Sequence, residues 1–332
     1  MRLTYYHISI LFLLSAFAAL VIIFSGVYFY LRLELPDISS LKHYRPPAVT
    51  TVYDRNGTPI AYWYLERRFP VPLKKMPPYL IQAFVSAEDA RFYEHKGIDF
   101  ISILRAILAD IRAGRVVQGG STITQQVARS LLLSRERTIS RKIREAILAW
   151  QIDKALSKDE ILNIYLNHIY LGAGAYGVES AARTYFGKHV WELTLPEAAL
   201  IAGLTPAPSR FNPLKNPELA LKRRSYVLRR MAEEGYITWE TARRAEATPL
   251  KLNPEDFSSN PLAGYFLQVV RKRLERMLGK HNLLIGGYRI YTSLDLSWTE
   301  KAWPKALQKL TEIPKRHRKK ELPQLAVVCL EN

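Results

Sequence analysis

The chain has 332 residues, enough for about two domains and a membrane anchor, and 48% of them are hydrophobic, which is ordinary for a globular protein. Its formal net charge of +18 is unusual and predicts an anionic partner, such as a nucleic acid, an anionic membrane surface or a phosphate-bearing substrate. The single cysteine, Cys329, excludes an internal disulfide, so an extracytoplasmic fold would depend on its hydrophobic core.

The first long apolar segment runs from Ile8 to Leu31 without a charged residue. At about 1.5 Å per residue, a helix over this segment would be long enough to cross a bilayer. A cleaved signal peptide is the alternative, but apolar residues continue well beyond the small-x-small site at 16–18. We therefore expect an uncleaved single-pass anchor over 1–34, with Arg2 favouring an inside N-terminus.

An extended linker and a β hairpin are expected over 35–76. Residues 50–64 alternate in polarity around Asn56-Gly57, a pair typical of a two-residue hairpin turn. From Pro77 onward the apolar period becomes that of helices, without alternating strands. Caps and helix-breaking residues predict helices over 77–96, 101–113, 121–132 and 140–156, from 157, from 194, and over 216–235. Residues 77–250 are thus predicted to form a mostly helical domain.

The pattern changes after Pro249, so residues 251–332 are treated as a separate region. Residues 265–278 predict a basic amphipathic helix, 287–292 alternate like a strand, and 325–330 are typical of a buried strand. The basic run at 315–320 lacks interleaved aromatic residues, so nucleic acid is not the expected partner.

Glu88 is the first candidate for catalysis. Phe92 and His95 follow it at i+4 and i+7, so on a continuous helix the three side chains would share one face. Transfer of a sugar requires a base that takes a proton from the attacking hydroxyl, and a glutamate among apolar neighbours suits that role. The alternative is a solvated helix charge without a function.

The polar, glycine-containing stretch 118–126 is a second candidate. Its glycines, including Gly120, would let the backbone approach a ligand closely. Ser121 could cap a helix whose free N–H groups and positive dipole attract phosphate. An ordinary capped surface helix is the alternative. Three further polar side chains follow at helical spacing and would share a face: Thr122, Gln126 and Arg129.

Glu145 lies one helical turn after two cations, Arg141 and Lys142. A diphosphate leaving group gathers negative charge in the transition state, and these cations would stabilise it, with Glu145 orienting them. The simpler alternative is a surface ion pair worth about 0.3–0.5 kcal/mol. Two separated acids, a polar loop and clustered cations together indicate glycosyl transfer from a phosphate-bearing donor.

The same stretches resemble a known family. Residues 88–97 (EDARFYEHKG), 118–126 (QGGSTITQQ) and 141–145 (RKIRE) resemble the first three motifs of the peptidoglycan glycosyltransferases, the lysozyme-like polymerase domain of class A penicillin-binding proteins. Residues 161–188 and 197–213 resemble two further stretches of that family. Five ordered matches within residues 48–250 are far more specific than any one alone. Ser130 departs from the family, which often has asparagine there.

The resemblance implies a mostly α, lysozyme-like fold, preceded by the membrane helix and small hairpin and followed by a short α+β extension. It implies that Glu88 is the general base on the acceptor sugar's 4-hydroxyl and that Glu145 is a second catalytic glutamate. The implied substrate-binding residues are Asp89, Phe92, His95, Gly120, Ser121, Thr122, Gln126, Arg129, Arg141 and Lys142.

The implied reaction is processive polymerisation of lipid II into β-1,4 glycan strands with release of undecaprenyl diphosphate. No obligate cofactor is implied, although a divalent cation, Mg²⁺ or Mn²⁺, could be used. The implied partners are lipid II, the growing lipid-linked strand, the membrane and cell-wall synthesis proteins, with the catalytic domain on the outer face of the bacterial cytoplasmic membrane. In this family a transpeptidase domain begins near the end of this sequence, so 251–332 is expected to be a linker and the truncated start of such a domain.

Two other classes of function remain open. A lysozyme-like hydrolase or lytic transglycosylase would act on glycan strands with an acid and would need no diphosphate pocket, which Arg129, Arg141 and Lys142 argue against. A non-catalytic membrane-anchored scaffold would not need both glutamates. Incubation with labelled lipid II separates the three, because they yield a ladder, cleavage of preformed strands, or no reaction.

Overall fold

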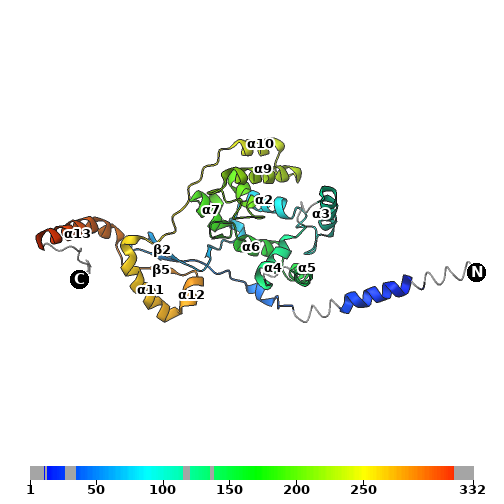
Figure 1. Cartoon of the computed structure of the whole chain (residues 1–332), viewed down its shortest axis with the longest axis horizontal. Helices are drawn as coiled ribbons and strands as arrows, with labels where there is room; N and C mark the ends of the chain where they lie inside the picture. Colours follow the sequence, from blue (N-terminus) through cyan, green and yellow to red (C-terminus); the bar gives the residue numbers. More distant parts are fainter. Residues whose placement is uncertain (1–10, 12, 27–34, 115–119, 135–137, 318–332) are drawn as a thin grey trace, which may run out of the picture.

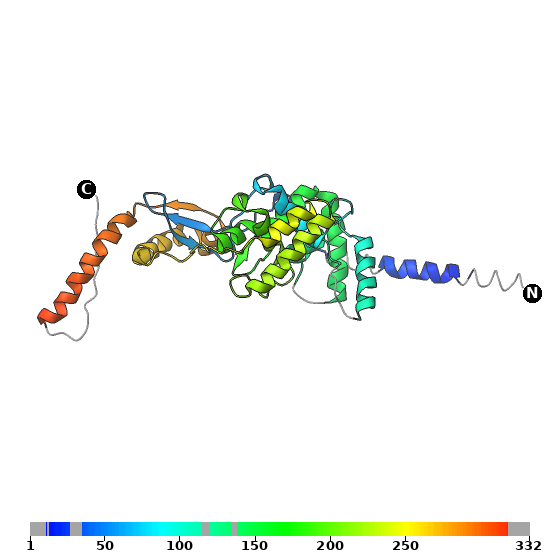
Figure 2. The same ribbon diagram turned by 90° about the horizontal axis from the view of Figure 1, so that it is seen from above.

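The computed structural model describes residues 11, 13–26, 35–114, 120–134 and 138–317. A helical domain occupies the middle of an elongated molecule, with a smaller lobe at one end and the helix at 13–26 projecting from the other (Figures 1 and 2). Among the described residues, no helix is both long enough and apolar enough to cross a membrane. The span expected over Ile8–Leu31 lies partly outside those residues.

The helical domain is built around one hydrophobic core, in which Leu80, Phe84, Leu148 and Leu166 are fully buried. The predicted capping box of Ser157 and Glu160 begins α6. The helices of this domain are α2 (Pro78–Glu88), α3 (Phe100–Ala113), α4 (Ile123–Leu132), α5 (Ile139–Ala155), α6 (Lys158–His168), α7 (Val178–Phe186), α8 (Leu195–Gly203), α9 (Pro217–Glu233) and α10 (Trp239–Ala247).

The first helix is shorter than predicted. α2 ends at Glu88, because Asp89 has φ −160° and ψ 70°, outside the helical region. The Asp89 carboxylate accepts hydrogen bonds from the main-chain N of Ile123 and from His95, which hold this conformation. The prediction that Glu88, Phe92 and His95 share one helix face is therefore wrong.

The smaller lobe joins segments from the two ends of the sequence. Its sheet has the order β2-β1-β5, in which β1 (Thr50–Tyr53) pairs antiparallel with β2 (Pro59–Trp63) and parallel with β5 (Arg289–Tyr291). α11 (Gly264–Leu278) and α12 (Lys280–Ile285) complete a second core with this sheet. α13 (Leu296–His317) follows, and the strand expected at 325–330 lies outside the described residues.

Shorter elements connect these parts. β3 (Arg67–Arg68) and β4 (Ala175–Tyr176) form a separate parallel pair. The 3₁₀ helices are η1 (Ser39–His43), η2 (Leu73–Lys75), η3 (Val190–Glu192) and η4 (Pro261–Ala263).

Arg183 of α7 fastens the segment after α10 to the helical domain. Its guanidinium donates two hydrogen bonds to the carboxylate of Glu255, at 2.5 and 2.6 Å, and lies 3.9 Å from the ring centroid of Phe69. Tyr62 of β2 also donates to Glu255, at 3.1 Å. Burial, reinforced by the Glu255 charge, raises the pKa of Tyr62 to about 12. The hairpin, α7 and the later segment thus meet at one ion pair.

His168, at the end of α6, gives the fold a pH dependence. Its Nδ1 lies 3.0 Å from the hydroxyl of Tyr44, and burial, with the nearby charge of Arg68, lowers the His168 pKa from 6.5 to about 4. Because the unfolded chain binds this proton at higher pH, the stability due to neutral His168 is present above pH 6.5 and is lost as the pH falls toward 4.

We predict that His168 makes the free energy of unfolding fall by about 3 kcal/mol between neutral pH and pH 4. In His168→Asn the side-chain oxygen can keep the contact with Tyr44, but the titrating ring is gone. Guanidinium unfolding of both proteins at a series of pH values measures the difference. Equal pH dependence in the two would contradict the buried neutral histidine.

Candidate active site

Glu88, the last residue of α2, is held from two sides by residues distant in the sequence. Its Oε2 accepts a hydrogen bond of 2.7 Å from Nε2 of Gln126 in α4. Its Oε1 accepts one from the hydroxyl of Thr205, just beyond α8. The residue is partly exposed, so a substrate hydroxyl could reach the carboxylate. A fixed carboxylate that solvent can reach has the geometry of a general base.

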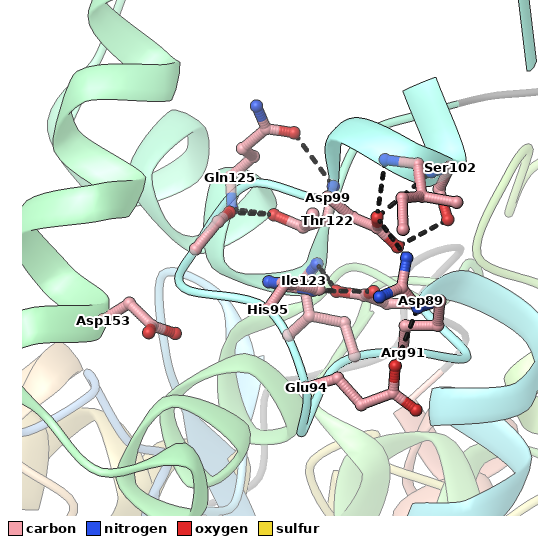
Figure 3. A network of polar contacts seen from close by, with 12 residues as sticks. Asp89, Arg91, Glu94, His95, Asp99, Ser102, Thr122, Ile123, Gln125 and Asp153 are labelled. Carbon is pink, nitrogen blue, oxygen red and sulfur yellow. Dashed lines mark hydrogen bonds and ion pairs between the residues drawn. The ribbon is translucent and has the colours of Figure 1, made fainter. Parts of the chain in front are cut away.

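The turn after Glu88 is anchored by buried polar contacts (Figure 3). Asp89 bonds to His95 Nε2 at 2.9 Å and accepts from the Ile123 main-chain N at 3.0 Å. Thr122 donates to the carbonyl of Gly97 at 2.6 Å, and Phe92 is fully buried. The polar contacts of Asp89, His95 and Thr122 thus hold the turn that follows Glu88, and Phe92 lies in the core beneath it. Binding of substrate by these four residues stays a prediction.

α4 is capped by Thr122, in a capping box with Gln125, and not by Ser121 as predicted. The main-chain N–H of Gln125 donates to Thr122, while that of Ile123 donates to Asp89. These helix N-terminal donors were expected to be free for a phosphate, and both already have protein acceptors. An anionic ligand near α4 must therefore rely chiefly on side-chain cations.

Such cations surround Glu145 in α5, whose side chain has 0% exposure. Arg141 Nη1 donates to Oε2 at 3.1 Å, and Lys142 Nζ donates to Oε1 at 2.5 Å and to the Ser121 hydroxyl at 2.8 Å. The surface ion pair considered from the sequence is excluded, because the Glu145 carboxylate is fully buried. Removal of the cations would leave an unpaired buried charge, which is strongly destabilising. The Lys142 side chain is 48% exposed, so its ammonium can also reach a ligand.

α4 brings the two centres together. Ser121, just before the helix, contacts Lys142, and Gln126 contacts Glu88. Arg129 is exposed one turn further along. Gly120 passes α3, where an added Cβ would lie 3.4 Å from Ile103 Cα, an ordinary contact.

Two neighbours of Glu88 were missed from the sequence. Thr205 lies 117 residues away from Glu88 along the chain, so no local spacing of residues in the sequence could reveal their contact. Arg223 of α9 is close enough for its charge and that of Glu88 to affect each other, although burial has the larger effect and lowers the Arg223 pKa. Within the described part of the chain, no group of three His, Cys, Asp or Glu side chains could hold a metal ion.

A solvent-accessible carboxylate held by neutral donors, beside a second carboxylate that gathers cations, defines a site suited to moving a sugar from an anionic leaving group. The sequence model of the family described as Transglycosylase matches residues 56–232, more than half of the 332 residues. The chain therefore belongs to the transglycosylase family, the glycosyltransferase domain found in class A penicillin-binding proteins.

Several individual proteins are similar to this chain over most of its length. Penicillin-binding protein 1A of Aquifex aeolicus is 46% identical, over 84% of this chain and 39% of that protein. The protein of the same name from Escherichia coli is 46% identical over 81% and 32%, and that of Rickettsia felis is 41% identical over 93% and 40%. A crystal structure of penicillin-binding protein 1A from Haemophilus influenzae matches with 27% identity and a TM-score of 0.48, over 87% of this chain and 34% of that one. The chain thus spans two fifths or less of the length of these relatives.

The turn at Gly97 gives a direct test of how closely the segment after Glu88 packs on α5. Gly97 has φ +82°, and a Cβ there would lie 2.7 Å from the carbonyl carbon of Ala149 in α5. Gly235 has a similar φ of +76° but no atom within 4 Å of an added Cβ. Both alanine variants pay about 1–2 kcal/mol of backbone strain, so the comparison isolates the clash.

We predict that Gly97→Ala lowers the free energy of unfolding by about 2 kcal/mol or more beyond the loss in Gly235→Ala. Urea denaturation of the two variants and the parent chain measures both losses. If the two variants are equally stable, the close packing of this turn on α5 is not what holds it.

Proposed function

We propose that the protein polymerises lipid II into β-1,4-linked glycan strands and releases undecaprenyl diphosphate. The observation that carries the proposal is Glu88, partly exposed and fixed by hydrogen bonds from Gln126 and Thr205. Glu88 takes the proton of the acceptor's 4-hydroxyl as that oxygen bonds to the donor's anomeric carbon. The bond from that carbon to the diphosphate breaks, and inversion of an α-linked donor gives the β link.

The cation centre receives the leaving group in this proposal. Lys142 and Arg141 lie beside the buried Glu145 and, through Ser121, at the start of α4. Negative charge accumulates on the diphosphate as the bond breaks, and preorganised cations stabilise that charge. Glu145 contacts one cation through each of its carboxylate oxygens, so we assign it to orienting them. Arg129 is an exposed additional contact for the donor.

The proposal includes the place of action. The uncharged segment Ile8–Leu31 is proposed as a single membrane anchor, with the catalytic domain on the outer face of the bacterial cytoplasmic membrane. The net charge of +18 suits a diphosphate donor held at an anionic membrane surface. Lipid II, the growing lipid-linked strand and other cell-wall synthesis proteins are the proposed partners, and a divalent cation could assist at the diphosphate.

The competing function is hydrolysis or lytic cleavage of existing glycan strands. Such a reaction has no diphosphate leaving group, so it gives no role to a cation cluster beside a second carboxylate. The contacts of Arg141 and Lys142 with Glu145 favour polymerisation for this reason.

We predict that Glu88→Gln lowers the rate of lipid II polymerisation by about 10²–10⁴-fold, because the amide cannot accept the proton. Glu94→Gln is the matched control, since Glu94 lies in the same turn with its side chain 64% exposed. Gel electrophoresis of products from labelled lipid II measures both. Near-normal strand synthesis by Glu88→Gln would contradict the assignment of Glu88 as the general base.

We predict that Lys142→Ala weakens binding of the diphosphate-bearing donor by about 10–100-fold, from the loss of one charged contact. Lys154→Ala removes an exposed cation from the same helix and should change binding less than about twofold. Titration with lipid II and with a lipid-free disaccharide acceptor separates the two substrates. An equal loss of affinity for both would contradict a role at the diphosphate.

A further inference from the structure

The hydroxyl of Thr205 has two acceptors within reach. It contacts Oε1 of Glu88, and it also lies 3.0 Å from the main-chain carbonyl of Ala202 in α8. A hydroxyl carries one hydrogen, which it can give to only one good acceptor at a time, and its oxygen can accept from another donor. Thr205 therefore has an alternative partner inside the protein whenever Glu88 does not need its hydrogen.

The end of α8 is packed so that Thr205 cannot easily move away. Gly203 lies against α9, where an added Cβ would be 3.1 Å from Cβ of Arg223. Arg223 Nε donates to the Gly203 carbonyl at 3.2 Å, and its guanidinium lies 4.4 Å from the ring centroid of Tyr226. The chain that carries Thr205 is thereby fixed to α9, and its hydroxyl stays at the carboxylate.

Of the described side chains, Gln126 and Thr205 hydrogen-bond to Glu88, and only the Thr205 hydroxyl can both donate and accept at the contacting atom. Gln126 presents an amide nitrogen, which only donates. Tyr165 of α6 and Arg223 of α9 are close enough for their charges and that of Glu88 to interact, and Asp89 and Arg129 also act on Tyr165. Burial, with a smaller effect of Glu88, raises the pKa of Tyr165 well above its ordinary value, and its buried hydroxyl makes no hydrogen bond to Glu88. Arg223 remains a cation and cannot accept a hydrogen bond.

We propose that Thr205 is a positioning residue for the proposed base, one whose hydroxyl matches both protonation states of Glu88. While Glu88 is ionised, Thr205 donates to Oε1 and Gln126 donates to Oε2. When the proton of the acceptor hydroxyl passes to Glu88 and the new glycosidic bond forms, Thr205 turns its hydrogen to the Ala202 carbonyl, and its oxygen accepts from the protonated carboxyl. This inference rests on the proposed function of Glu88.

The test compares Thr205→Val, which keeps the shape and loses the hydroxyl, with Thr205→Ser, which keeps the hydroxyl. Both are made in the full chain and assayed with labelled lipid II across a pH series. Thr205→Val should lower kcat by about 10–100-fold with little change in KM. The acidic limb of its pH profile should move to higher pH, because the carboxylate loses a hydrogen-bond donor. Thr205→Ser should restore both the rate and the pH profile.

The outcomes distinguish a failure of the proposed role of Thr205 from a failure of the proposed polymerase function. If the parent chain makes strands, Glu88→Gln does not, and Thr205→Val behaves as the parent, the role of Thr205 is wrong and the base assignment stands. A failure of Thr205→Ser to restore the profile also overturns it. If the parent chain makes no strands from lipid II, the proposed function itself fails. Thermal unfolding by circular dichroism identifies a misfolded Thr205→Val, in which case Thr205→Ala is assayed in the same way.

Discussion

The hydrogen bond from the Ile123 main chain to the Asp89 carboxylate fixes the geometry on which the site depends. One buried carboxylate, that of Asp89, follows the end of α2 at Glu88, satisfies a donor at the start of α4, and binds His95. The base therefore lies at the end of one helix and beside another, where Gln126 can reach it. Loss of this carboxylate would leave buried donors unpaired and would release both helix ends together.

The two catalytic candidates are carboxylates in opposite surroundings. Glu88 is partly exposed and is held by two uncharged donors, which leave it able to take a proton. Glu145 is fully buried and binds two cations, which offset the cost of burying it, and its carboxylate keeps those cations in place. Glycosyl transfer needs a proton acceptor for the acceptor sugar and positive charge for the leaving group of the donor. The different surroundings of the two glutamates suit these two needs.

The small lobe shows which contacts local sequence patterns can predict and which they cannot. The alternation at 50–64 and the turn at Asn56-Gly57 indicated the two strands that the structure contains as β1 and β2. The pairing of β1 with β5 could not be predicted, because it joins residues more than 200 positions apart through main-chain bonds that no sequence period encodes. The ion pair of Glu255 with Arg183 of α7 could not be predicted either, because the two side chains are 72 positions apart and share no local pattern.

The sequence by itself determined the helical domain, the capping boxes that begin α6 and α8, and the side chains that could do chemistry, because apolar period, capping residues and motif composition are local properties. It placed Phe92 and His95 wrongly on a helix face, since the break at Asp89 is stabilised by a residue of α4. Only the tertiary structure decided which candidates support the site from inside, that Glu145 is buried, and that Thr205 lies at Glu88. Those outcomes depend on how distant helices pack, where burial and hydrogen-bond partners come from other parts of the chain.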